Sequence, residues 1–302
     1  MPHNGLTRGE LMAGLAAVPA GFAPAPGLSA LLAQLAPENG RIAPERVRAS
    51  GIPVRELMLR LHPWARGFAH PPISHFFVGA IVEGASGALY AGMNLEFPGQ
   101  TLAFTVHGEG AATTNAWLHD ETGIVSLAVG GVPCGYCRQF LAEFVAPEKL
   151  TIWLPQGGSI TLAEALPHAF LPTVLGVRVD PFHSRRTLRL AAPNDDPLLR
   201  AALGAAARSH APYSGSYAGV ALRLTDGVVV TGRHAENVAY NPGMPPLQAA
   251  LVALRLRGRT EREIVGAALV ETAGHASQRD ATRAVLATLT GVPLAYARAL
   301  AA

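Results

Sequence analysis

Apolar residues recur at helical spacing in two early parts of the chain. Residues 1–48 are rich in Ala, Leu and Pro with this spacing, and they end in the turn-like segment APENGRIAPE. From about residue 49, the segment IPVRELMLRLHPWARGFA again places apolar residues at the helical period. This pattern predicts a small helical N-terminal region over 1–48, followed by a further helix.

Strand-like and helical segments then alternate. The runs FFVGAIV and GALYAGMNLEF are typical of two strands joined by a Gly-Ser turn. The segment HGEGAATTNAWL predicts a helix, GIVSLAVGG a third strand, and the residues from Cys134 through GYCRQFLAEFV a second helix. Helices that alternate with strands indicate a layered α/β fold.

The chain contains an internal repeat, in which residues 72–97 align without gaps with residues 212–237 at an offset of 140. The identical positions are a proline, a serine, three glycines and a glutamate: Pro72, Ser74, Gly79, Gly87, Gly92 and Glu96 match Pro212, Ser214, Gly219, Gly227, Gly232 and Glu236. Because backbone geometry holds glycines at turns, this agreement predicts two copies of one fold. The expected parts are a helical region, a first domain, a linker and a second domain: 1–48, 49–160, 161–190 and 191–302.

The second copy lacks the residues that could carry chemistry in the first. At the same offset, residues 107–109 (HGE) stand opposite residues 247–249 (LQA). Both cysteines of the chain, Cys134 and Cys137, also lie in the first copy. We therefore expect the second domain to be a structural copy without catalytic activity.

Composition and charge exclude several classes of protein. Charged residues make up 15% of the chain and the net charge is +3. The densest group of arginines, RGRTERE (257–263), alternates with acids, which favours a solvated helical face over a nucleic-acid patch. No uninterrupted apolar run reaches the roughly 18 residues of a membrane span. Two cysteines are too few for a disulfide-stapled secreted protein, so we expect a cytoplasmic protein with neither nucleic acid nor membrane as a partner.

The two cysteines lie in PCGYC, downstream of a histidine and a glutamate in the segment HGE. A CxxC at a helix start is compatible with a thioredoxin-type redox pair, because the helix dipole favours the thiolate. It is also compatible with half of a structural zinc site, although such sites are usually closed by four protein ligands. A third interpretation is a catalytic zinc held by His107, Cys134 and Cys137, with an open fourth position.

The H-x-E pattern favours the third interpretation. A histidine and a glutamate two residues apart in the first turn of a helix can both face the space beyond its N-terminus. Two thiolates and a neutral imidazole balance the charge of Zn²⁺, and two helix N-termini add a positive field that keeps the thiolates ionised. Zinc would lower the pKa of a bound water toward about 7, and Glu109 could take up its proton. We therefore expect one zinc ion per chain.

H-x-E followed by P-C-x-x-C is the signature of zinc deaminases, and the chain resembles the cytidine deaminases of the longer, dimeric bacterial type. The resemblance spans most of the chain, through SHFFVGA, GMNLEFPG, TVHGEGAATTNAWL, PCGYCRQFLAEF, LPHAFLP, APYSGSYAGVAL and NPGMPPLQAAL. It implies a duplicated three-layer α/β/α sandwich with a small helical N-terminal region and a zinc-free C-terminal copy. It further implies a homodimer that converts cytidine or deoxycytidine to uridine or deoxyuridine plus ammonia in pyrimidine salvage.

The resemblance also implies roles for single residues. His107, Cys134 and Cys137 would hold zinc while hydroxide attacks carbon 4 of the pyrimidine. Glu109 would protonate ring nitrogen 3 and then the leaving amine. The backbone N–H of Gly108 would help to hold the base carbonyl.

Four further residues match substrate-binding positions of the family. Asn94 and Glu96 match its ribose-binding pair, Phe76 the aromatic residue near the base, and Phe170 a residue that reaches into the partner subunit's site. Alternatives remain: Asn94 as a turn residue, and both phenylalanines as core aromatics. The repeat keeps the glutamate but not the asparagine, which favours function for Asn94 and weakens the case for Glu96 alone. Arg138 is either a donor to a thiolate or an exposed helix residue.

The sequence favours a free nucleoside over a polynucleotide as substrate. A carboxylate such as Glu96 near the ribose 3′-hydroxyl would accept a hydrogen bond from a nucleoside and repel a 3′-phosphate. Polynucleotide binding also needs a cationic groove and stacking platforms, whereas aromatic residues make up only 6% of the chain.

Two departures from the family concern the site itself. Gly108 replaces the usual alanine, and GGV (130–132) replaces the aromatic residue often found before PCxxC. Both changes are expected to loosen the pocket. The alternative function is therefore a zinc- and nucleoside-binding protein with weak or altered deaminase activity.

Overall fold

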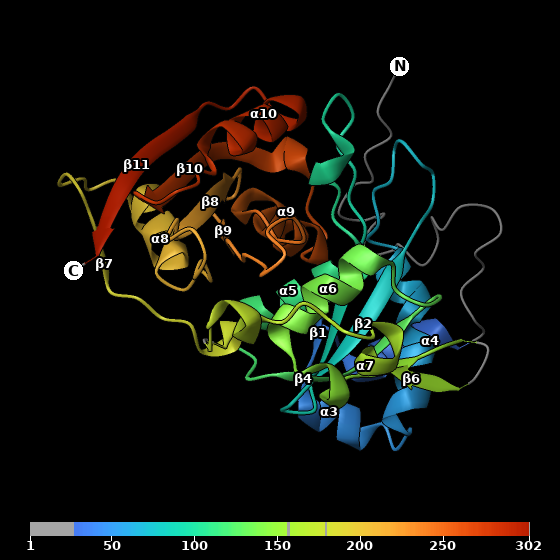
Figure 1. The fold of residues 1–302 in the computed structure, drawn as a ribbon. Helices are drawn as coiled ribbons and strands as arrows, with labels where there is room; N and C mark the ends of the chain where they lie inside the picture. Colours follow the sequence, from blue (N-terminus) through green and yellow to red (C-terminus); the bar gives the residue numbers. More distant parts are fainter. Residues whose placement is uncertain (1–26, 156–157, 179, 302) are drawn as a thin grey trace.

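The computed structural model describes residues 27–155, 158–178 and 180–301. They form two lobes, each built around one β-sheet with helices against it (Figure 1). The predicted helical region is described only from Gly27 onward, where it comprises two helices and a short strand: α2 (Leu28–Leu35), β1 (Arg41–Ile42) and α3 (Pro44–Ala49). Among the described residues, no helix is long and apolar enough to cross a membrane.

The first lobe contains a six-stranded sheet in the order β1-β3-β2-β4-β5-β6, in which only β4 and β5 pair in parallel. Its further strands are β2 (Gly79–Gly84), β3 (Leu89–Met93), β4 (Ile124–Val129), β5 (Thr151–Trp153) and β6 (Ser159–Thr161). Its further helices are α4 (Val54–Arg66), α5 (Gly108–Leu118), α6 (Gly135–Phe144) and α7 (Leu162–Ala165). The predicted helices and strands of this half are therefore confirmed.

Helices cover both faces of this sheet. A Cβ built on Gly79 of β2 would meet the backbone of Arg66 in α4, whereas one built on Gly92 of β3 would meet Ala112 in α5. Ala80 is paired with Gly92 and neighbours Gly79, so the two glycines face opposite sides. The first lobe is thus a three-layer α/β/α sandwich, as predicted.

The second lobe contains a five-stranded sheet in the order β7-β11-β10-β8-β9. Its strands are β7 (Leu188–Leu190), β8 (Ala218–Leu224), β9 (Val229–Arg233), β10 (Ile264–Thr272) and β11 (Leu294–Ala301). Its helices are α8 (Pro197–Ala206), α9 (Pro246–Leu256) and α10 (Arg279–Leu289). The core order β9-β8-β10-β11 repeats β3-β2-β4-β5 of the first lobe, again with one parallel pair at the end.

The strand register confirms the duplicated fold. The hairpin β2–β3 pairs Gly79 with Met93, and the hairpin β8–β9 pairs Gly219 with Arg233, 140 residues later in both strands. The turn glycines Gly87 and Gly227 have φ angles of 82° and 84°, a left-handed conformation that favours glycine. Backbone geometry therefore explains why these glycines occur in both copies.

The offset changes from 140 to 138 before the helix that follows each hairpin. A Cβ on Gly92 would meet Ala112, and one on Gly232 would meet Ala250. Ala112 therefore corresponds to Ala250, which lies two residues before the position that an ungapped alignment at an offset of 140 predicts. The true counterpart of HGE (107–109) is PPL (245–247), and the predicted pairing with LQA was wrong. The loop after β9 is two residues shorter than the loop after β3. Neither PPL nor LQA offers a metal ligand.

Two other segments differ from expectation. The predicted linker contains α7, two 3-10 helices (Pro172–Leu175 and Pro181–His183) and β7, which pairs antiparallel with β11. The segment RGRTERE is not one helical face, because α9 ends at Leu256, a turn follows, and only Glu261–Glu263 form a short 3-10 helix. In it, Arg259 is largely buried and pairs with Asp226 at 2.6 Å and Glu263 at 2.5 Å.

The main hydrophobic core spans both lobes, and a second, smaller cluster lies within the second lobe. Helices α5 and α9 pack against each other at the junction (Figure 1). The main buried cluster includes residues of both lobes, such as Trp117 and Leu251. The guanidinium of Arg233 lies 4.2 Å from the centre of the Trp117 ring and donates a hydrogen bond to its main-chain carbonyl.

Candidate active site

Three potential metal ligands meet where two helices begin. His107 directly precedes α5, and Cys134 directly precedes α6. His107 Nδ1 lies 3.5 Å from Cys134 Sγ, which lies 3.6 Å from Cys137 Sγ. The three ligand atoms all lie within 4.8 Å of one another.

This donor set fits zinc. Tetrahedral zinc takes nitrogen at about 2.0 Å and sulfur at about 2.3 Å, which separates neighbouring ligand atoms by roughly 3.5–3.8 Å. The separations of 3.5 Å between His107 and Cys134 and 3.6 Å between the two cysteines agree with this geometry. Among the described residues, no other group of three such side chains could hold a metal ion.

The two sulfur atoms lie 3.6 Å apart and form a hydrogen bond. This hydrogen bond lowers the pKa of Cys134 to about 5, and further hydrogen bonds from the start of α6 act in the same direction. The same pairing, together with burial, raises the pKa of Cys137. A divalent cation bound here would be held by two thiolates, because metal binding to cysteines generally releases their protons.

Glu109 faces this cluster from the first turn of α5. Its side chain is buried, and its Oε2 lies 3.4 Å from Cys137 Sγ. Burial raises the pKa of this carboxyl group. A carboxylate in this position can exchange protons with a group bound beside the three ligands without being a ligand itself.

A cavity of about 510 Å³ opens in front of Glu109. Seven residues predicted for the site line it: Phe76, Asn94, Glu96, His107, Gly108, Glu109 and Cys134. The structure thus brings together residues from the segment after β3, from the loop before β2 and from the starts of α5 and α6.

Asn94 and Glu96 hold the loop that forms the cavity mouth. Asn94 Oδ1 accepts a hydrogen bond from the Val78 amide at 2.9 Å, and Asn94 Nδ2 donates one to the Phe76 carbonyl at 2.8 Å. Glu96 accepts hydrogen bonds from the Ser74 amide at 2.9 Å and its hydroxyl at 2.5 Å. Burial alone would raise the pKa of Glu96, but these hydrogen bonds outweigh it and leave the pKa lowered.

The second copy repeats the contacts of Glu96. Glu236 accepts hydrogen bonds from the amides of Tyr213 at 2.9 Å and Ser214 at 3.1 Å, and from the Ser214 hydroxyl. Because the second copy lacks the ligand cluster, this arrangement serves the loop itself. A structural role is therefore certain for the carboxylate of Glu96, and any substrate contact is additional.

The two phenylalanines and Arg138 lie in different surroundings. Phe76 is 70% exposed, so it is not a core aromatic residue. Phe170 is 41% exposed and does not line the cavity of its own chain, although its carbonyl accepts a hydrogen bond from Gln139 at 2.7 Å. Arg138 donates to the carbonyl of Ala165 and to neither cysteine.

The sequence did not reveal that His62 and Arg66 of α4 also line the cavity. A Cβ on Gly130 would lie 3.3 Å from His62 Cε1, so the imidazole packs where GGV leaves space. The predicted loosening of this wall is thus partly offset. Burial and the nearby Arg66 lower the pKa of His62 to about 4. No local signal marks this residue, because helical spacing alone does not show that it faces the end of β4.

Comparisons with known proteins agree with this geometry. Two models of the cytidine and deoxycytidylate deaminase zinc-binding region match the chain, at residues 55–152 and 162–283. The chain is 46% identical to a cytidine deaminase of Yersinia pestis (strain Pestoides F) over 246 residues, which cover 80% of this chain and 82% of that protein. It is 43% identical to a cytidine deaminase of Aeromonas hydrophila subsp. hydrophila over 278 residues, 90% of this chain and 94% of that protein.

A crystal structure of cytidine deaminase from Mycobacterium tuberculosis is also similar, with 29% sequence identity and a TM-score of 0.33. That match covers 38% of this chain and 93% of the other. The relatives from Yersinia and Aeromonas instead match along most of both chains. With two deaminase regions and this identity to full-length relatives, the chain belongs to the cytidine deaminase family, in its longer, duplicated form.

Proposed function

We propose that the protein hydrolyses cytidine and deoxycytidine to uridine and deoxyuridine, with release of ammonia. The observation that carries this proposal is the meeting of His107, Cys134 and Cys137 beside Glu109 at the head of a cavity. The three residues would hold one zinc ion per chain. When bound, zinc acts as a Lewis acid that makes water nucleophilic at neutral pH.

Glu109 moves the protons of the reaction. It takes one proton from water as the oxygen attacks carbon 4 and delivers this proton to ring nitrogen 3. It then takes the second proton from the new hydroxyl group on carbon 4 as the carbonyl forms, and delivers it to the amine, which leaves as ammonia. Its buried position supports this role, because a carboxyl group with a raised pKa holds a proton more readily than an exposed one.

The remaining cavity residues orient the nucleoside. The backbone N–H of Gly108 belongs to the first turn of α5, whose amides have no partner within the helix, and it donates to the base carbonyl. Phe76 packs near the base, while Asn94 and Glu96 bind the ribose. The carboxylate of Glu96 would repel a 3′-phosphate, which favours free nucleosides over nucleotides and nucleic acid.

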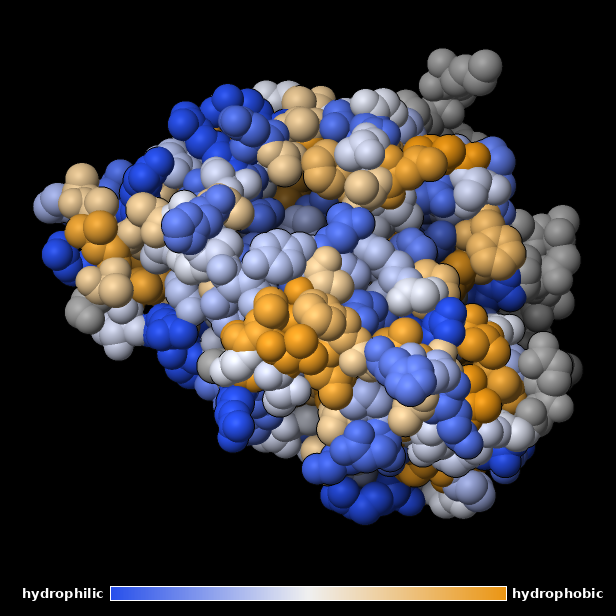
Figure 2. Space-filling view, viewed as in Figure 1, coloured by the Kyte–Doolittle hydropathy of each residue, from blue (hydrophilic) through white to orange (hydrophobic). Residues whose placement is uncertain are grey.

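We also propose that two chains form a homodimer, active in pyrimidine salvage in the cytoplasm, with Phe170 reaching the partner subunit's site. Phe170, Val174 and Leu175 expose apolar side chains in one segment. Figure 2 shows apolar side chains gathered at the lower centre of this face, over the yellow-green segment of Figure 1. Such a patch is typical of an interface.

Substitution of Glu109 tests the proposed function. The wild-type protein should contain one zinc per chain, measured by elemental analysis, and should deaminate cytidine. Glu109→Ala should keep the zinc and lose activity by two or more orders of magnitude, as expected for a general acid–base residue. The control is Glu164→Gln, which changes an exposed carboxylate outside the cavity and should behave like the wild type.

A wild-type protein that binds zinc but leaves cytidine and deoxycytidine unchanged would contradict the enzyme proposal and favour a zinc- and nucleoside-binding protein. Equal activity on cytidine and cytidine 3′-phosphate would contradict the ribose–carboxylate contact. A reversible Cys134–Cys137 disulfide without metal would instead indicate a redox pair.

A further inference from the structure

One face of α6 forms hydrogen bonds with the second half of the chain. Tyr136, Gln139 and Glu143 lie at positions i, i+3 and i+7, which places them along one side of a helix. All three side chains form hydrogen bonds with residues beyond 209. Because Cys134 directly precedes α6 and Cys137 lies in its first turn, this face belongs to the helix that positions two of the three proposed zinc ligands.

The far end of this face is anchored most strongly. Glu143 is fully buried and accepts hydrogen bonds from His210 Nε2 at 2.8 Å and the Tyr213 hydroxyl at 2.7 Å. It also accepts one from the Val238 amide at 2.8 Å. Three donors on one buried carboxylate fix the position of α6 against the second lobe.

The middle of the face contacts the loop after β9. Asn237 Nδ2 donates to the Gln139 carbonyl at 2.9 Å, and Gln139 Nε2 lies 3.5 Å from Asn237 Oδ1. This loop continues to Gly243 at the near end of the face. Together these contacts prevent α6 from sliding along its axis or rotating about it.

The near end of the face reaches the ligand cluster through Tyr136. The phenol hydroxyl donates to the Gly243 carbonyl at 3.0 Å, and the ring stacks on His107 with centroids 5.4 Å apart and planes inclined by 28°. Tyr136 stands between Cys134 and Cys137 in the sequence. It therefore contacts His107, directly precedes Cys137 and lies two residues after Cys134.

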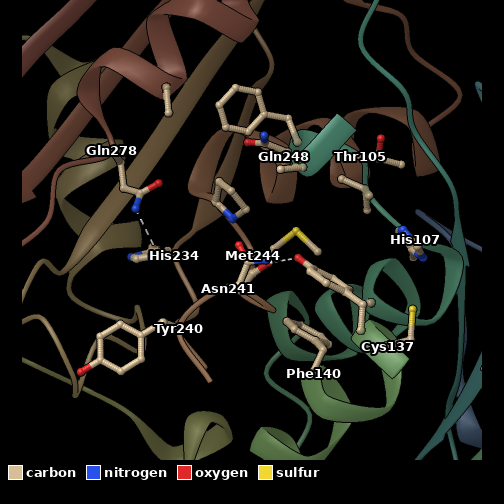
Figure 3. Close-up of a pocket in the computed structure, with 18 of the residues that line it drawn as sticks. Thr105, His107, Cys137, Phe140, His234, Tyr240, Asn241, Met244, Gln248 and Gln278 are labelled. Atoms are coloured by element: carbon tan, nitrogen blue, oxygen red, sulfur yellow. Dashed lines mark hydrogen bonds between the residues drawn. The ribbon is translucent and has the colours of Figure 1, made fainter. Parts of the chain in front are cut away.

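Figure 3 shows this junction from the side of a cavity of about 260 Å³ between the lobes. His107 and Cys137 lie on one side of it, and His234 and Gln278 of the second half on the other. Met244 and Asn241, which flank the turn that contains Gly243, lie between them. The loop after β9 is thus the part of the second lobe nearest to the ligand cluster.

We propose that the second half of the chain positions the zinc ligands, and that Tyr136 is the residue through which it does so. Among the residues that the structure describes, the second half adds none to the ligand cluster, but it fixes α6 at three points and orients the His107 ring through the phenol of Tyr136. Tyr136 is a positioning residue and not a catalytic one. This inference rests on the zinc site proposed above.

The test compares two substitutions that each remove one hydroxyl from the same interface of the full-length protein. Tyr136→Phe removes the hydrogen bond to Gly243 and keeps the ring over His107. Tyr213→Phe removes a hydrogen bond to Glu143 at the opposite end of α6. Zinc affinity is measured by competition with a chromophoric chelator, the geometry of the site by the visible spectrum of the cobalt(II) form, and folding by thermal denaturation.

Tyr136→Phe should weaken zinc binding about tenfold, within the range found for residues that orient metal ligands, and should shift the cobalt spectrum. It should lower kcat for cytidine and leave KM unchanged. Tyr213→Phe should lower the melting temperature but leave zinc affinity and the cobalt spectrum as in the wild type. This pattern would separate positioning from a general loss of stability.

Wild-type zinc affinity and cobalt spectrum in Tyr136→Phe would overturn the inference while leaving the proposed function intact. Equal losses of zinc affinity in both variants would also overturn it, because the effect would then follow stability alone. A wild-type chain that bound no zinc would instead refute the proposed function itself.

Discussion

Glu96 and Glu236 make the same structural contacts in the two halves, and ribose binding is proposed for Glu96 alone. Both carboxylates bind the amides of the loop before a strand, with nearly the same distances. Only Glu96 also lines the cavity beside the ligand cluster. Glu236 can therefore serve as a control for substitutions of Glu96.

We expect Glu96→Gln and Glu236→Gln to destabilise the protein similarly, by about 1–3 kcal/mol, because each weakens charge-assisted hydrogen bonds to a loop. Only Glu96→Gln should also raise KM for cytidine. Denaturant unfolding and steady-state kinetics measure the two effects. If Glu236→Gln raised KM as much as Glu96→Gln, the effect would come from loop stability and not from ribose binding.

Gly108 has a tight environment at the head of the cavity. A Cβ at this position would lie 2.9 Å from Val78 Cγ1, closer than van der Waals contact allows. Val78 lines the same cavity, and its branched side chain has little rotamer freedom. The absence of a side chain at Gly108 thus leaves room for the Val78 side chain in this protein.

Gly108→Ala should raise KM for cytidine by about two- to tenfold, because a strained Val78 side chain costs roughly 0.5–1.5 kcal/mol. Zinc content should not change, and stability should not fall, since alanine favours the helix. Adding Val78→Ala should remove the difference between glycine and alanine at 108. An unchanged KM in the single variant would show that Val78 adapts without affecting the cavity.

At the scale of elements, each hairpin lies very close to the helix that follows it. A Cβ on Gly92 would lie 2.0 Å from the Ala112 amide nitrogen, and one on Gly232 would lie 2.2 Å from that of Ala250. The sequence revealed these glycines as repeat positions, but only the structure shows that close packing, and not a turn, requires them. In the first half this packing sets the distance from β3, which carries Asn94 at its end, to α5.

Gly92→Ala and Gly232→Ala should each cost about 2 kcal/mol or more, because backbone atoms must move to make room. Gly204→Ala is the control, since this exposed helical glycine has nothing within 4 Å of its added Cβ and the change should stabilise by up to about 1 kcal/mol. Urea unfolding measures all three. Wild-type stability in the Gly92 or Gly232 variant would contradict the close approach.

At the scale of the molecule, a buried carboxylate joins the two lobes. Glu143 of the first lobe and His210 of the second have no exposed side-chain surface. The three tryptophans, Trp64, Trp117 and Trp153, all lie in the first half. Their fluorescence therefore reports on the first lobe and, through Trp117 beneath Arg233, on its junction with the second, whereas far-ultraviolet circular dichroism reports on the secondary structure of both lobes.

Glu143→Ala should destabilise the protein by about 3 kcal/mol or more, because it leaves several buried donors without an acceptor. The fluorescence and circular dichroism transitions should coincide in the wild type and separate in the variant. Glu148→Ala, which removes an exposed carboxylate four residues beyond α6, should leave both transitions unchanged. Coincident transitions in Glu143→Ala would show that the shared core alone couples the lobes.

The sequence by itself determined the duplication, the layered fold and the residues that form the ligand cluster. These features depend on local signals: glycines at turns, alternating apolar runs, and the spacing of HGE and PCGYC. The positions of Asn94, Glu96 and Phe76 near the cavity also followed from the sequence, through the family resemblance. Such patterns extend over a few residues each, so they can be recognised in the sequence without the tertiary structure.

Only the tertiary structure decided how the two copies meet. The two-residue shift that pairs HGE with PPL arises in a loop, where length is not constrained by strand register. His62 reaches the cavity from α4, and Tyr136 joins His107 to Gly243 across the lobes. These contacts link residues far apart in the chain, and no local pattern encodes them because they depend on how helices pack after the sheets have formed.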